Sequence, residues 1–93
     1  MYSQLKPINA MPIVFTFFGF RFLFFSNDHE PIHIHVVKGT GPIVESAKFN
    51  ILPEVLLIEN DGLKQSELKM AEAVIEENKE VIIERWNEFF NNK

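Results

Sequence analysis

Hydrophobic positions along the chain follow two different periods. In the first two thirds, aromatic and β-branched residues form short runs separated by turn-forming residues, a pattern typical of β-strands. From about Lys64 the apolar residues recur every three or four positions, the spacing of one face of an α-helix. The pattern therefore predicts an α+β fold in which the strands come first and the helix last.

The strand-forming part predicts an antiparallel sheet of four to five strands, built from two hairpins. Gly19 hinges the first hairpin, and Gly39 to Gly41 make the turn of the second. The predicted strands cover residues 13–18, 20–26, 32–38 and 43–51, with a shorter fifth strand near 54–60. The turn signal Asp61-Gly62 ends this part of the chain.

The remainder predicts one long C-terminal helix packed on the sheet. No Gly or Pro interrupts residues 64–93. The apolar stripe consists of Leu68, Ala71, Ile75, Ile82, Trp86 and Phe89. Asn78 and Lys79 interrupt this stripe with polar side chains, so we place any kink near Asn78. We expect Trp86 to anchor the end of the helix to the sheet.

Length and composition indicate a single α+β domain over residues 11–93. A chain of 93 residues has room for one hydrophobic core, and its hydrophobic content of 46% is that of a folded protein. Residues 1–10 show no periodicity and contain Pro7 and Asn9. We interpret them as a flexible N-terminal extension.

The first hairpin is unusually apolar. Thr16 and Arg21 are its only polar side chains, so both faces of the hairpin carry aromatic residues. A single helix covers only one face of a sheet, and an exposed apolar patch usually marks an interface. We therefore expect a homo-oligomer or a complex with a protein partner.

The same apolar stretch argues against a membrane segment. It runs from Met11 to Phe25, contains Arg21, and falls short of the roughly 20 residues that a membrane-spanning helix needs. No basic start followed by a small-residue cleavage site is evident. We predict a cytoplasmic protein that does not bind membranes.

Charge argues against a nucleic-acid partner. The net charge is −4, and the second half of the chain carries most of the acidic residues. Residues 1–50 contain four basic and three acidic residues, whereas residues 51–93 contain five basic and ten acidic ones. Nucleic-acid binders usually show a basic patch or stripe.

All three histidines lie in "NDHEPIHIH", residues 27–35. His33 and His35 are two positions apart on a predicted strand, so their side chains project from the same face. His29 belongs to the preceding loop. The candidate binding surface comprises Asp28, His29, Glu30, His33 and His35.

One interpretation of this surface is a divalent transition-metal site. His33 and His35 would be two ligands, and His29, Asp28 or Glu30 would supply the third. The chain contains no cysteine, so thiolate ligands are excluded.

The register of the second hairpin weakens that interpretation. If the apolar residues of both strands share one face, the histidines share the other with Ser46 and Lys48. A lysine near His33 would repel a cation.

Two other interpretations stay open. The histidines could act as general base or acid, although no nucleophile adjoins them in the sequence. They could also be polar strand residues that face solvent or a partner. In that case neither is needed for the core, and replacing His33 and His35 with Gln should change stability by less than about 1 kcal/mol.

Four segments resemble a known family: "MPIVFTFFGFRFLFFSNDHEPIHIHV", "AKF", "ENDGL" and "IEENKEVIIERWNEFF". They are similar to the small prokaryotic family catalogued as domain of unknown function 4160, over residues 11–91. Ile32 stands where the family's Asp-His-x-Pro-Pro-His-x-His-Val signature usually has a second proline. The matching signature positions are Asp28, His29, Pro31, His33 and His35.

The resemblance implies a bacterial source, a start at Met11 and a setting beside another small gene, as in toxin–antitoxin pairs. It implies no activity. Three classes of function follow. The favoured one is a non-enzymatic partner-binding or regulatory module of a toxin–antitoxin-like pair, with the histidine-rich loop and strand as its functional surface. The others are a hydrolase or nuclease that depends on the histidines or on a metal, and a simple metal-binding protein.

Overall fold

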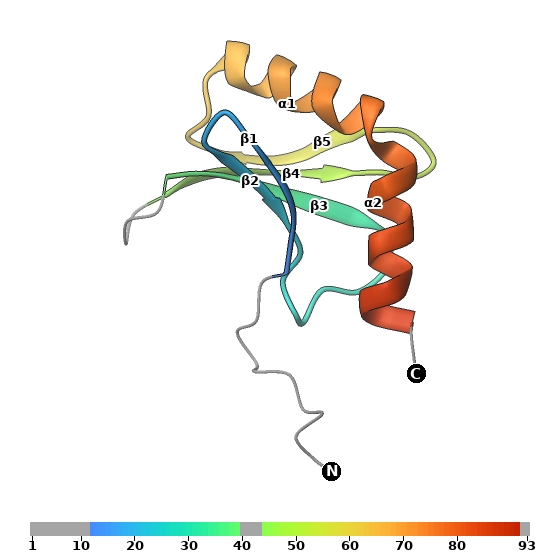
Figure 1. The fold of residues 1–93 in the computed structure, drawn as a ribbon. Coiled ribbons are helices and arrows are strands. Elements are labelled where there is room, and N and C mark those ends of the chain that lie inside the picture. Colours follow the sequence, from blue (N-terminus) through green and yellow to red (C-terminus); the bar gives the residue numbers. More distant parts are fainter. Residues whose placement is uncertain (1–11, 40–43, 92–93) are drawn as a thin grey trace.

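The computed structural model describes residues 12–39 and 44–91 and shows a five-stranded antiparallel sheet with its strands in sequential order (Figure 1). The strands are β1 (Ile13–Phe17), β2 (Phe20–Leu23), β3 (His33–Lys38), β4 (Glu45–Asn50) and β5 (Leu56–Asp61). Helices α1 (Gln65–Glu77) and α2 (Lys79–Trp86) follow, and a π-helical segment, Asn87–Asn91, ends the described chain. The predicted α+β class is confirmed. The predicted N-terminal extension lies outside the described residues, as does the predicted start of the fourth strand at residue 43.

The hydrophobic core lies between one face of the sheet and the helices. Strand pairing places Phe22 opposite Val36 and Val36 opposite Ala47. All three side chains are buried. The helices contribute Leu68, Ala71, Ile75, Ile82 and Trp86 to the same core. Figure 1 shows α1 running across this face, with α2 turning away at one end of the sheet.

The register of the β3–β4 hairpin is the one that the hydrophobic pattern favours. His35 pairs with Lys48 and Val37 with Ser46, so the two strand histidines alternate along β3 with the core residues Ile34 and Val36. Lys38 pairs with Glu45, which leaves residues 39–44 as the connection. An even number of connecting residues keeps the apolar positions of both strands on one face.

The prediction of one long helix is wrong in detail, because the chain forms two. The backbone of Asn78 leaves the helical region (φ −119°, ψ 22°), and its side-chain amide donates to the carbonyl of Val74 at 2.8 Å. α1 ends at Glu77, just before Asn78, and α2 begins at Lys79. The break falls at the polar interruption of the stripe, and Ile75 before it and Ile82 after it are both buried in the core.

The first hairpin closes through a two-residue turn, Phe18-Gly19, with positive φ at both positions (47° and 83°). Phe20, Phe22 and Phe24 are buried in the core. The exposed aromatic residues of the hairpin therefore belong to β1 and its turn. Among the described residues, no helix is long and apolar enough to cross a membrane.

Candidate functional site

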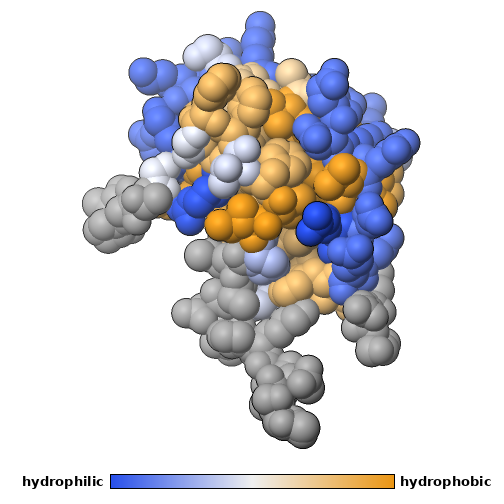
Figure 2. Space-filling view, in the orientation of Figure 1, coloured by the Kyte–Doolittle hydropathy of each residue, from blue (hydrophilic) through white to orange (hydrophobic). Residues whose placement is uncertain are grey.

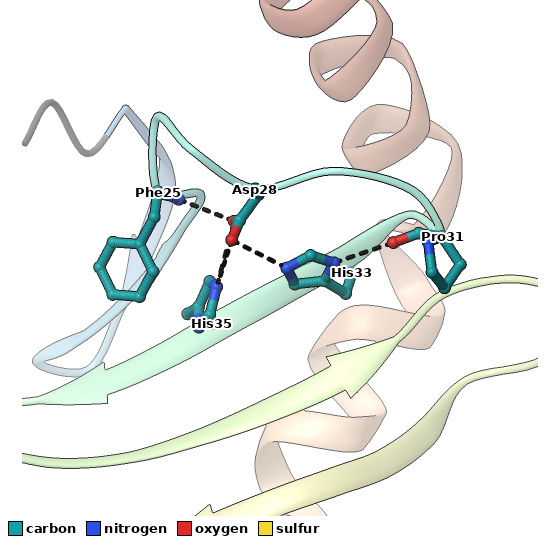
Figure 3. A network of polar contacts seen from close by, with 5 residues as sticks. All are labelled: Phe25, Asp28, Pro31, His33 and His35. Carbon is teal, nitrogen blue, oxygen red and sulfur yellow. Dashed lines mark hydrogen bonds and ion pairs between the residues drawn. The ribbon is translucent and has the colours of Figure 1, made fainter. Parts of the chain in front are cut away.

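A polar cluster forms where the loop between β2 and β3 folds back over β3. Its members are Asp28 from the loop and His33 and His35 from the strand (Figure 3). The two rings project side by side from one face of β3, and the Asp28 carboxylate lies between them. One oxygen or nitrogen from each of the three side chains lies within 4.8 Å of the other two. We call these three residues the Asp–His–His cluster.

A local turn holds Asp28 in this position. The Phe25 amide donates to Asp28 Oδ2 at 2.8 Å, and the Asp28 amide donates to the Phe25 carbonyl at 3.0 Å. Aspartate commonly accepts such local backbone hydrogen bonds in turns. An aspartate three residues after Phe25 is therefore a sequence signal for the turn. The sequence does not show that the carboxylate contacts the two strand histidines.

His33 is oriented by a backbone carbonyl and buried under a helix. Its Nδ1 lies 2.8 Å from the Pro31 carbonyl oxygen. Because a carbonyl only accepts hydrogen bonds, Nδ1 must carry a hydrogen and donate it. The ring packs against Trp86 of α2 with centroids 5.3 Å apart, and only 5% of the residue is exposed. The expectation that both strand histidines face solvent or a partner is thus wrong for His33, because α2 closes over this end of the sheet.

The second nitrogen of His33 has an unusual environment. Nε2 lies 3.1 Å from Asp28 Oδ1, which is ion-pair distance. This nitrogen is buried, and it forms no aligned hydrogen bond with any of the residues that the structure describes. In a neutral ring with Nδ1 protonated, Nε2 carries a lone pair, so two acceptors face each other here.

His35 is the more accessible of the two histidines. Its Nε2 lies 3.1 Å and 3.3 Å from the two carboxylate oxygens of Asp28. Its ring lies on Phe25, with centroids 4.1 Å apart. A neutral His35 satisfies these contacts by donating from Nε2 to the carboxylate.

The Asp–His–His cluster favours a negative charge on Asp28 and a positive charge on His33. Burial would raise the pKa of Asp28, but the close contacts with His33 and His35 and the hydrogen bond from the Phe25 amide outweigh it and hold that pKa well below its usual range. Burial would likewise lower the pKa of His33, yet the contacts with Asp28 and Pro31 raise it. The geometry therefore favours a carboxylate beside a bound cation, which is either a proton on His33 or a metal ion.

The other predicted site residues lie outside this arrangement. His29 and Glu30 are exposed in the loop. They line a hollow of about 440 Å³ beside the cluster, together with Asn27, Lys48 and Asn50. Of the three ligands considered to complete the site, the structure brings Asp28, rather than His29, to the strand histidines. The hydrogen bond from Phe25 explains this choice, because it aims the Asp28 carboxylate at β3.

A second surface lies at the β1 edge of the sheet, and β5 forms the other edge. The second surface consists of Ile13, Phe17 and Phe18, and we call it the β1 hairpin surface. Phe18 is 87% exposed and Ile13 is 51% exposed. Figure 2 shows apolar side chains gathered in the middle of the face that carries β1, with hydrophilic side chains toward its margins.

Two hollows flank β1. One, of about 430 Å³, lies between β1 and α1, and its lining includes Phe15, Phe17 and Val74. The other, of about 250 Å³, lies between β1 and the last helical turns, and its lining includes Ile13 and Phe89.

Comparison with known proteins adds one finding. The family model described as "Domain of unknown function (DUF4160)" matches residues 19–87. The chain belongs to this family. No curated protein and no solved structure matches the chain. The matched range contains the whole Asp–His–His cluster and begins at the turn of the first hairpin, after β1.

Proposed function

We propose that this domain is a small protein-binding module of the bacterial cytoplasm, one component of a toxin–antitoxin-like gene pair, which docks its partner through the β1 hairpin surface. The observation that carries the proposal is Phe18, a large apolar side chain that is 87% exposed at the tip of the hairpin. The bacterial setting and the paired gene are those that the family resemblance implies.

The backbone of Phe18 supports a binding role. Two-residue turns of this kind favour Asn-Gly, because asparagine and glycine tolerate positive φ. A phenylalanine at φ 47° is an unfavourable choice for folding. Strained residues with exposed side chains are concentrated at functional sites, where a ligand rather than the fold selects the residue.

The edge position of β1 supports the same role. Among the described residues β1 pairs with β2 alone, so its outer edge offers backbone groups to an added strand. Peptides commonly bind in this way, with alternate side chains placed in neighbouring pockets. The hollows beside α1 and the last helical turns would receive apolar side chains of the partner.

The test is binding of the product of the adjacent gene to Phe18→Asn. This substitution installs the preferred Asn-Gly turn and removes the phenyl ring, so we expect the protein to be at least as stable as the unmodified chain. We expect affinity for the partner, measured by calorimetry, to fall at least tenfold, as for loss of an aromatic anchor.

A matched control is Leu56→Thr on β5, at the other edge of the sheet. Leu56 is also exposed, at 51%, and threonine suits a strand. This variant should bind as the unmodified protein does. Unchanged partner binding by Phe18→Asn would overturn the proposed docking surface.

A further inference from the structure

We propose that Asp28, His33 and His35 form a binding site for one divalent transition-metal ion, with a fourth coordination position open to the neighbouring hollow. This site lies apart from the β1 hairpin surface, and its occupancy does not depend on the proposed protein partner.

The contacts of Asp28 with each histidine have the spacing of ligands in a coordination sphere. Ligand atoms that lie about 2.0–2.1 Å from a tetrahedral ion are about 3.3 Å from one another. Asp28 Oδ1 is 3.1 Å from Nε2 of His33, and Asp28 Oδ2 is 3.1 Å from Nε2 of His35. All three ligand atoms fall within 4.8 Å of one another. Because 4.8 Å exceeds the ligand spacing of a tetrahedral ion, binding requires side-chain rotations that bring the three ligand atoms closer together.

The buried nitrogen of His33 points to a cation. Its Nδ1 hydrogen is engaged by Pro31, so the lone pair of Nε2 faces the Asp28 carboxylate without an aligned hydrogen bond. Metal-binding histidines typically donate their other ring N–H to a carbonyl or carboxylate, which fixes the ring and its tautomer. Pro31 supplies that contact here. A metal ion would satisfy both the lone pair and the carboxylate.

Lys48 does not offset this attraction. It lies opposite His35 in the sheet, where a positive charge would oppose metal binding. Glu59 of β5 lies opposite Lys48 in turn. An acidic residue therefore adjoins the lysine in the sheet, and the Asp28 carboxylate lies 3.1 Å from the Nε2 atom of each histidine.

The ligand types define the class of metal. Two imidazoles and one carboxylate suit Zn²⁺, Co²⁺ and Ni²⁺, whereas Mg²⁺ and Ca²⁺ prefer oxygen ligands. Asp28 and His33 both line the hollow of about 440 Å³. A water molecule at the fourth position would lie there, next to Asn27 and Asn50.

The test is titration of the chelator-treated full chain with Co²⁺ and Zn²⁺, followed by calorimetry and by the visible absorption of Co²⁺. We expect one ion per chain and absorption bands typical of four-coordinate cobalt. His35→Gln should weaken binding at least tenfold, because it removes a ligand while leaving the buried His33 in place.

His29→Gln is the matched control, since His29 is an exposed histidine of the same loop. It should bind both ions as the unmodified chain does. Thermal unfolding of each variant without metal shows whether it is folded. Absence of saturable binding by the folded chain would overturn the proposal, as would equal affinity in His35→Gln or a loss confined to His29→Gln.

Discussion

Among the polar residues that the structure describes, His33 is the most deeply buried. Its contacts connect the Asp–His–His cluster to the core. Its ring touches Trp86 on one side and His35 on the other. Its Nδ1 engages Pro31. At the residue scale, the polar cluster is therefore part of the packing at one end of the sheet, and the two strand histidines are not equivalent.

This difference leads to unequal effects of substitution. The expectation that Gln at both histidines leaves stability nearly unchanged rested on surface positions, and the burial of His33 removes that premise. Replacing His33 with Gln leaves buried polar groups imperfectly paired, which should cost about 1–3 kcal/mol. His35→Gln should cost less than about 1 kcal/mol. Urea unfolding of the metal-free variants measures both values, and equal costs would contradict this account.

Substitution of Trp86 should lower stability more than substitution of His33, with which Trp86 packs. It is 1% exposed and packs against Phe24, Phe90 and His33. Trp86→Ala should lower the free energy of unfolding by about 3–5 kcal/mol, the usual cost of deleting a large buried aromatic. Denaturant unfolding followed by circular dichroism gives this value.

Val81→Ala provides the control for Trp86, because Val81 is 41% exposed on the same helix. Its effect should stay within about 0.5 kcal/mol. A loss of similar size in both variants would mean that α2 as a whole, rather than the tryptophan contact, determines stability.

At the scale of elements, Glu67 joins the start of α1 to β3. Its carboxylate accepts from Lys38 of β3 and from the backbone amide of Lys64 at the helix N-terminus. These contacts lower the pKa of Glu67, with the hydrogen bond from Lys38 as the largest cause. An acidic side chain in the first turn also complements the helix dipole.

The lowered pKa predicts a pH-dependent contribution to stability. A carboxyl group whose folded pKa lies below its unfolded value stabilises the fold above the unfolded pKa. It loses that contribution as pH falls through the folded pKa. The difference in stability between the unmodified chain and Glu67→Gln should therefore be constant near neutrality and vanish in acid. Urea unfolding from pH 7 to pH 3 measures it, and a difference that grows in acid would contradict the assignment.

At the scale of the whole molecule, exposed apolar side chains occupy both edges of the sheet. Ile13, Phe17 and Phe18 lie at the β1 edge, and Leu56, Leu57 and Ile58 lie on β5. Sheet edges of this kind readily pair with other chains. Formation of a homo-oligomer or of a complex with a partner remains a prediction for the intact chain.

Light scattering tests this prediction at micromolar concentration. We expect either a dimer or larger assembly of the chain alone, or a stable complex once the product of the adjacent gene is added. Phe18→Asn should shift the distribution toward the monomer. A monomer under both conditions would count against an interface on either edge.

The order of elements and the register of the second hairpin could be predicted from the sequence, because periodicity and the parity of apolar positions are local properties. The same pattern placed the helix interruption at Asn78. It also placed His33 and His35 on one face of β3. Side-chain alternation along a strand follows from backbone geometry alone, so these features need no knowledge of distant residues.

Only the tertiary structure decided which groups those histidines meet. Trp86 reaches His33 because α2 turns over the end of the sheet after the break at Asn78, a contact across more than fifty positions. Asp28, rather than His29, completes the cluster because the Phe25 amide aims its carboxylate at β3. Burial and hydrogen-bond geometry depend on how elements pack, and the packing of distant elements is not encoded in local spacing.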